Sequence, residues 1–156
     1  MNTMLSRRSV VSPLTAVLIV SVLVWSMGFL GWVKYANAAS VTSYKDTLSD
    51  SDLSALANHT ITFTTPTGVA SGGTIAITFP AGFNMGSVAF GDVDLADDGT
   101  DVTIAATAAG TTWGAAVSGQ VLTFTNGTTA VAGGSVVVIE IGTNATFGGA
   151  GVNRIT

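Results

Sequence analysis

Apolar and polar residues alternate along several short segments of this chain, and this pattern constrains the fold more than any other feature. In the segment 60–64, Ile61 and Phe63 alternate with three threonines. The segment 74–79 repeats the pattern with Ile and Phe at every second position. Successive side chains of a strand point to opposite faces of a sheet, so both segments predict strands with one buried face.

Further segments are rich in β-branched and aromatic residues and predict additional strands. They are residues 87–90, 102–107, 111–117, 121–126 and 135–141. Turn-forming pairs such as Asp98-Gly99 and Ser118-Gly119 separate them. About seven short strands at this spacing predict an all-β, antiparallel sandwich over residues 59–156. No long amphipathic helical pattern interrupts them, which argues against an α/β fold.

A short internal similarity supports this interpretation. Residues 61–79 (ITFTTPTGVASGGTIAITF) align without gaps on residues 122–140 (LTFTNGTTAVAGGSVVVIE), with Thr-Phe-Thr and Gly-Gly in common. Chance in a biased composition is one explanation. The other is a strand-loop-strand unit that is used twice within one core.

The segment Gly68–Phe83 (GVASGGTIAITFPAGF) resembles the GxxxGgTIxITFPxGF stretch of immunoglobulin-like modules in large bacterial surface and S-layer-type proteins. Gly133-Gly134-Ser135 with the apolar strand after it, and residues 151–156 (GVNRIT), resemble the tail of such a module. The resemblance covers roughly residues 61–156 and carries no catalytic residues. It implies an immunoglobulin-like sandwich with a structural or adhesive role. It also implies further strand sequence after Thr156, so the chain is expected to be a fragment.

The first 38 residues predict an export signal. Residues 9–33 contain no charge, and Arg7 and Arg8 precede them, which favours a cytoplasmic N-terminus and an exported body. Ala36 and Ala38 form the A-x-A pattern that signal peptidase reads, so cleavage is expected after Ala38. The alternative is an uncleaved anchor, because an apolar helix of 20 residues spans about 30 Å and would hold the protein in the membrane. Either interpretation predicts an extracellular or cell-surface body.

Residues 39–58 are polar, with scattered apolar positions. They predict a surface connector, with a short helix over about 49–57 as the alternative.

The body after residue 38 is strongly acidic. It holds all nine acidic residues of the chain and only two bases, Lys45 and Arg154, which gives a formal charge of −7. Such a charge repels phosphate groups, so nucleic acid is not an expected partner. The chain has no Cys, which excludes disulfides and thiolate metal ligands.

An acidic stretch at residues 92–101 is the one constellation that could bind a metal. Five carboxylates in ten residues could chelate Ca²⁺, which accepts six to eight oxygen ligands. The spacing differs from an EF-hand loop, and Asp-Asp-Gly is also an ordinary hairpin turn, so a solvated acidic turn is favoured and calcium is the alternative. The candidate ligands are Asp92, Asp94, Asp97, Asp98 and Asp101.

Neither His59 nor Trp113 predicts a catalytic or sugar-binding site. His59 is the only His, and a zinc site would need further ligands. We expect it to face solvent or to cap a strand. Trp113, the only Trp of the body, is expected to pack in the core next to Gly114.

These patterns predict an exported cell-surface module with a structural or adhesive role, no catalytic activity and no cofactor. Two alternatives stay open: a secreted carbohydrate-binding or enzyme-accessory domain, and a self-assembling surface-layer or filament subunit. The expected partners are other surface proteins or copies of the chain itself.

Overall fold

The computed structural model of the protein describes residues 17, 18, 21, 40–146 and 151–156. The chain divides into two units, residues 1–38 and residues 39–156, and the account below concerns the second. The predicted export signal, with Ala36 and Ala38, lies outside the described residues apart from positions 17, 18 and 21. Among the residues described, no helix combines the length and the apolarity needed to cross a membrane.

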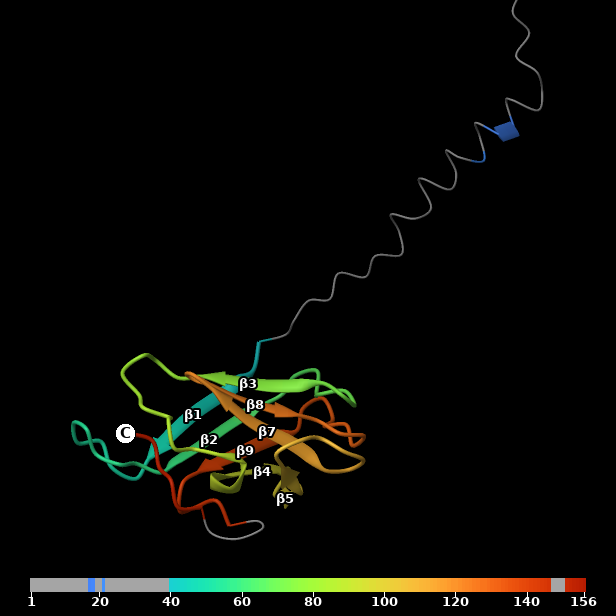
Figure 1. The fold of residues 1–156 in the computed structure, drawn as a ribbon. Coiled ribbons are helices and arrows are strands. Elements are labelled where there is room, and N and C mark those ends of the chain that lie inside the picture. Colours follow the sequence, from blue (N-terminus) through green and yellow to red (C-terminus); the bar gives the residue numbers. More distant parts are fainter. Residues whose placement is uncertain (1–16, 19–20, 22–39, 147–150) are drawn as a thin grey trace, which may run out of the picture. The chain divides into compact units, whose positions relative to one another are not determined.

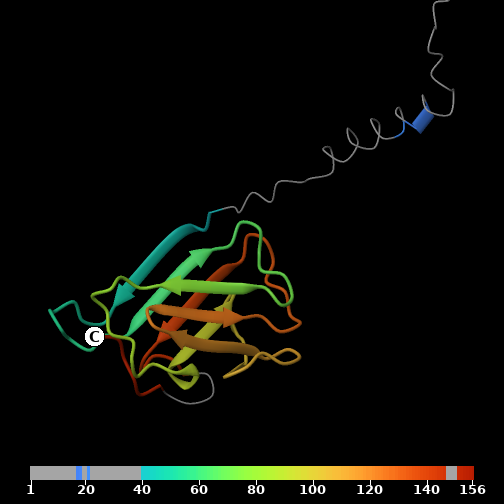
Figure 2. The same cartoon turned by 45° about the horizontal axis from the view of Figure 1, so that its top comes forward.

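Residues 40–146 form two β-sheets that lie face to face, with the strands of one crossing those of the other obliquely (Figures 1 and 2). The first sheet has the order β1-β2-β9-β4-β5, and the second has the order β3-β8-β7-β6. The bounds are β1 Thr42–Leu48, β2 His59–Thr64, β3 Thr74–Thr78, β4 Val93–Asp97, β5 Thr100–Asp101, β6 Ile104–Ala105, β7 Trp113–Ser118, β8 Val121–Thr125 and β9 Val136–Ile141. The predicted all-β sandwich is confirmed at this level. Not every pair is antiparallel, because β6 runs parallel to β7.

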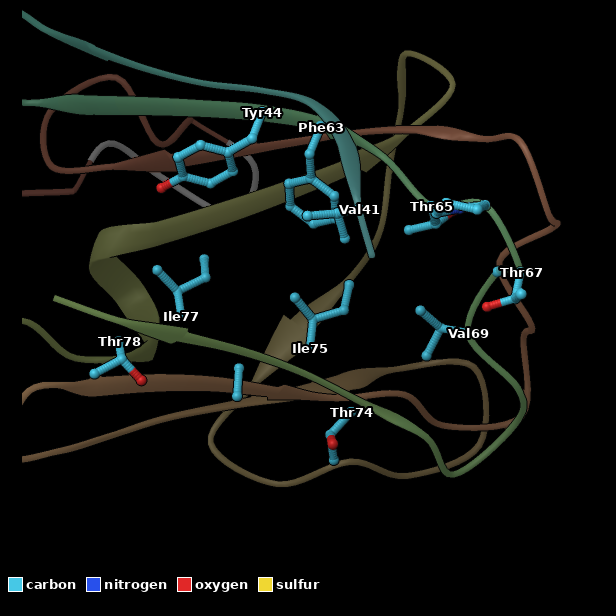
Figure 3. A pocket seen from close by; sticks show the side chains of 13 residues that line it. Val41, Tyr44, Phe63, Thr65, Thr67, Val69, Thr74, Ile75, Ile77 and Thr78 are labelled. Carbon is cyan, nitrogen blue, oxygen red and sulfur yellow. The ribbon is translucent and has the colours of Figure 1, made fainter. Parts of the chain in front are cut away.

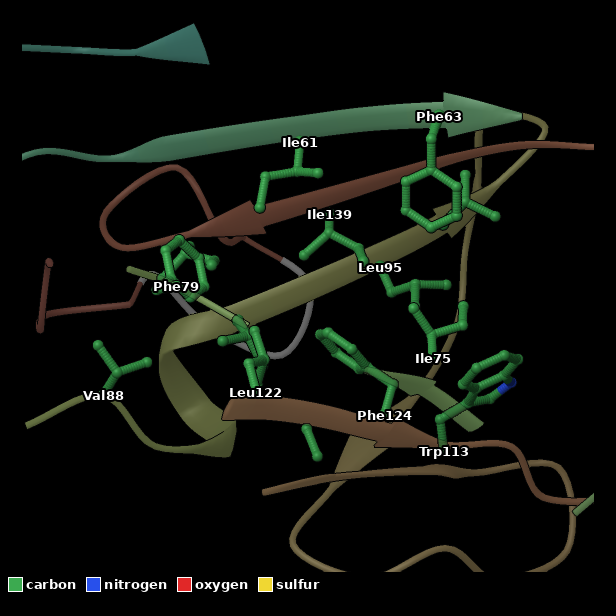
Figure 4. Close-up of a cluster of buried hydrophobic side chains, with 14 of the residues drawn as sticks. Ile61, Phe63, Ile75, Phe79, Val88, Leu95, Trp113, Leu122, Phe124 and Ile139 are labelled. Carbon is green, nitrogen blue, oxygen red and sulfur yellow. The ribbon is translucent and has the colours of Figure 1, made fainter. Parts of the chain in front are cut away.

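The alternating residues fill the space between the sheets. Ile61 of β2 and Ile139 of β9 are opposite each other in register and completely buried. They face Leu122 and Phe124 of β8, which are also completely buried (Figure 4). Each large apolar side chain removed from water stabilises the fold by about 1.5–3 kcal/mol, so this layer provides the main driving force for folding.

Several expected boundaries are wrong. The expected connector 39–58 contains a seven-residue edge strand, β1, which pairs with β2, and its described residues, 40–58, form no helix. The expected strand 87–90 is a turn that leads into a 3₁₀-helix, η2 (Phe90–Asp92). The acidic stretch expected to be a turn is mostly the strand β4, which sits beside β9.

The internal similarity corresponds to two equivalent structures. In each copy the chain crosses from one sheet to the other: β2 leads to β3, and β8 leads to β9. The copies pair antiparallel, β2 with β9 and β3 with β8. Their loops meet at Val69 and Val131, whose backbones exchange hydrogen bonds of 3.0 and 2.9 Å. One strand-loop-strand unit is therefore used twice around a shared core.

The two sides of the sandwich differ. At one side the chain passes directly from β5 in the first sheet to β6 in the second, so residues 100–105 bridge the sheets. At the other side the edge strands β1 and β3 belong to different sheets and are not hydrogen-bonded to each other. This second side, called the open side below, contains the candidate site.

Candidate binding groove

A groove lies on the open side, between β1 and β3. Its volume is about 440 Å³. Tyr44 and Phe63 enter it from the first sheet, while Ile75 and Ile77 enter it from β3 and point toward them (Figure 3). Tyr44 is exposed, whereas Phe63 and Ile75 are buried at the base of the groove. The groove is thus an apolar slot with its mouth in solvent.

No charged side chain is among the thirteen residues that line the groove. The pKa of the Tyr44 hydroxyl is raised above its ordinary value, first by burial and then by the negative charge of Asp46. Tyr44 therefore stays neutral at any physiological pH. The groove is an uncharged surface on a body of charge −7.

Within the described part of the chain, one edge of β3 has no ladder partner, and its backbone groups lie at the rim of the groove. The amide of Phe79 donates to the carbonyl of Gln120, and the amide of Asn126 donates to the carbonyl of Gly73. In an antiparallel ladder, bonding toward one neighbour alternates from residue to residue. Odd-numbered residues of β3 therefore bond to β8, and Thr74, Ala76 and Thr78 direct their amides and carbonyls away from it.

A buried His–Asp pair lies farther along the same side. Nδ1 of His59 is 2.9 Å from Oδ2 of Asp46, which ties β2 to β1. The imidazole is completely buried and packs edge-on against Phe79 and Phe83, with ring centroids 5.5 and 5.7 Å away. The expectation that His59 faces solvent is wrong. It lies on the inner face of β2 because its position is in phase with Ile61 and Phe63.

His59 also lines a second cavity of about 260 Å³. Its Nε2 has no hydrogen-bond partner among the described residues. A general base activates a nucleophile through a hydrogen bond, and no described residue makes one to this nitrogen.

Both carboxylate oxygens of Asp92 accept hydrogen bonds from other parts of the protein. It accepts from the backbone amides of Ala89, Val152 and Asn153 and from Nδ2 of Asn153, at 2.8–3.0 Å. Burial alone would raise its pKa, but these four donors outweigh burial and lower the pKa below the ordinary value for Asp. Asp92 thus joins η2 to the C-terminal segment 151–156.

Among the described residues, the other candidate calcium ligands do not gather into one cluster. Asp98 sits in the hairpin turn between β4 and β5, where its carboxylate accepts from the amide of Val136 and the hydroxyl of Ser135. Asp94 lies on the outer face of the first sheet opposite Glu140 of β9. Asp101 pairs with Ala96 and is also close to Glu140, whereas Asp97 pairs with Thr100 next to the turn. Within the described part of the chain, no three His, Cys, Asp or Glu side chains come together as a metal site.

Glu140 lies close to two other carboxylates, and its pKa is perturbed. Burial, and then the charges of Asp94 and Asp101, raise its pKa above the ordinary value for Glu. The exposure of the acidic residues decides the expectation of a solvated acidic turn. It is confirmed for the exposed Asp98-Gly99 turn, and it is wrong for Asp92 and Asp94, which are buried.

Trp113 is 1% exposed, which confirms the expected core position and leaves no aromatic platform for a sugar at this residue.

The sequence analysis did not predict the groove between β1 and β3. Its one signal was the five-residue strand β3, with apolar side chains on one face and no charge. No family model, curated protein or solved structure matches the chain.

Proposed function

We propose that the protein is an exported structural or adhesive module of the cell surface, without catalytic activity. The body is an immunoglobulin-like sandwich, and the segment 1–38 directs it out of the cytoplasm. The observation that supports the structural role is the resemblance of the segment Gly68–Phe83 to immunoglobulin-like modules of bacterial surface proteins, which carry no catalytic residues.

The immunoglobulin-like assignment rests on two features. The segment Gly68–Phe83 resembles the corresponding stretch of such modules, and in the sandwich it comprises the loop before β3, β3 itself and the turn after it. The parallel pair β6–β7 departs from a purely antiparallel arrangement.

The export part of the proposal is supported by the order of features in the sequence: two arginines, an uncharged apolar run and then Ala36 and Ala38. Peptidase recognition requires small side chains at these two alanines. Ala38→Arg is therefore expected to prevent processing. Asn37→Arg places the same charge between the two recognised positions and serves as the matched control.

The test is expression of the full chain with a C-terminal epitope tag, followed by fractionation, external protease treatment and N-terminal sequencing. The proposal predicts a protease-accessible body whose first residue is Ala39, and a longer, membrane-retained product for Ala38→Arg. A body that fractionates with cytosolic proteins and resists external protease would contradict it.

A further inference from the structure

The free edge of β3 differs from the other strand edges of the sandwich. It is five residues long, contains no charged residue and no proline, and pairs with β8 in regular register. No described strand pairs with its outward amides and carbonyls, on Thr74, Ala76 and Thr78, so they can form a further ladder. An unprotected edge of this kind is a template for strand addition.

The other three edges carry features that discourage pairing. β1 has Lys45 and Asp46 in its middle and a register shift next to Ser43, whose φ is +54°. β5 and β6 are only two residues long. Short strands, charges and bulges all protect sheet edges. The lack of such protection on β3 therefore singles out one edge.

The groove provides for the side chains of an added strand. Side chains that stand opposite Ile75 and Ile77 in the new ladder would point to the same face of the sheet as these two residues. That face looks into the 440 Å³ groove toward Tyr44 and Phe63 (Figure 3). Every second side chain of the added strand would therefore be buried there.

Charge decides which occupant fits. The lining is uncharged, so a strand with a charge at an inward position would lose its hydration without gaining an ion pair. A second copy of the body would bring another −7 charges beside the first and would place its own β1, with Lys45 and Asp46, at the contact. A single uncharged strand meets neither penalty.

We propose that the β3 edge captures an extended, uncharged strand of a partner polypeptide. The strand lies antiparallel to β3, which is the slightly more stable pairing, and buries an apolar side chain at every second position in the groove. This binding activity goes beyond the proposed structural role. It does not depend on where the protein is located, so its failure would leave the export proposal unaffected.

The probe is the synthetic peptide QVLTFTN, blocked at both ends, which copies residues 120–126. This uncharged sequence already pairs with β3 on its other edge, and its Leu and Phe are two residues apart. It is titrated into the isotopically labelled full chain in detergent micelles while amide shifts are recorded. Two control peptides share its length: one has the same composition with Leu and Phe adjacent, and one has Lys in place of both.

The decisive variant is Ala76→Pro. The amide of Ala76 points away from β8, so proline removes a donor from the free edge and leaves the β3–β8 ladder intact. Ala76→Thr keeps the amide and is the matched control. If Ala76→Pro does not fold, as judged by thermal unfolding, Thr74→Pro at the first residue of β3 replaces it.

Saturable binding is expected, with the largest amide shifts at Thr74, Ala76 and Thr78. Ala76→Pro is expected to weaken binding at least about tenfold, and Ala76→Thr to stay within about twofold of the original chain. Equal binding by the proline variant, equal binding of the control peptides, or no binding at millimolar peptide would overturn the proposal. A concentration-dependent dimer that Ala76→Pro abolishes without peptide would assign the edge to a second copy instead, and would equally overturn it.

Discussion

Gly68 has a backbone conformation that only glycine adopts without cost. Its φ is +73°, and a Cβ there would collide with the carbonyl oxygen of Val131 in the other copy of the repeated loop. Gly72 has nearly the same φ, +72°, but open space around its Cβ position. A side chain at Gly72 would therefore cause backbone strain alone, whereas a side chain at Gly68 would cause both backbone strain and steric overlap.

Gly72→Ala is expected to lower the free energy of unfolding by about 1–2 kcal/mol, the cost of a left-handed backbone. Gly68→Ala is expected to lower it by about 3 kcal/mol or more, because the loops must also move apart. Denaturant unfolding of both variants measures the difference. Equal losses would show that the contact between Gly68 and Val131 does not constrain the fold.

Because of Asp92, the free energy of unfolding is expected to depend on pH in the acidic range. Because its folded pKa lies below the unperturbed value of 3.8, its contribution is full above that value and is lost as the pH falls through the folded pKa. Asp92→Asn turns an amide donor toward groups that are themselves donors. It is expected to cost about 1–3 kcal/mol at pH 7, with the gap to the original chain narrowing below about pH 4.

Denaturant titrations at pH 7, 5, 4 and 3 measure this gap. Asp52→Asn, in an exposed loop, is the control and is expected to change little at any of these values. A gap for Asp92→Asn that is absent at pH 7, or that stays constant down to pH 3, would refute the role assigned to the carboxylate.

The outer face of the first sheet carries an electrostatic cost between neighbouring strands. Glu140 of β9 stands directly opposite Asp94 of β4, and like charges in this position destabilise a sheet. Because the pKa of Glu140 is raised in the folded state, protonation relieves the cost as the pH falls, and the cost returns as the pH rises through the folded pKa.

Glu140→Gln is expected to stabilise the protein by about 0.5–1 kcal/mol at pH 7 and to have no effect near pH 4. Asp101→Asn removes the weaker of the two neighbouring charges and is expected to give a smaller gain. Thermal unfolding at the two pH values compares them. A destabilised Glu140→Gln variant at pH 7 would show that Glu140 makes a favourable interaction instead.

Strands with a clean period of two were predictable from the sequence, and strands with mixed signals were not. β2, β3 and β8 place an apolar residue at every second position, and β9 consists mainly of β-branched residues; the positions of all four agree with the prediction to within a residue or two. β4 also alternates, with Val93 and Leu95 inward, but its acidic residues suggested a turn. β1 escaped prediction because an edge strand with one polar face buries little apolar surface.

The candidate site was only partly visible in the sequence. The inward position of His59 follows from its phase with Ile61 and Phe63, yet its contact with Asp46 depends on a strand that was not predicted. The groove could not be predicted at all, because it depends on which edge strands end up on the same side of the sandwich. Strand order is a tertiary property that the alternation of residues does not encode.

At the scale of the whole molecule, the asymmetry of the two sides is the central feature. One side is bridged by the continuous chain from β5 to β6, and the opposite side leaves β3 unpaired above an uncharged groove. The rest of the body is acidic and repels anionic partners. The sandwich thus exposes a single surface on which an uncharged strand can be added.

Amide hydrogen exchange along β3, measured in the full chain by NMR, tests this open edge most directly. The structure predicts an alternating pattern: slow exchange at Ile75 and Ile77, whose amides bond to β8, and fast exchange at Thr74, Ala76 and Thr78, whose amides point away from it. Equally slow exchange at all five residues would mean that the edge is already paired, and would contradict the account.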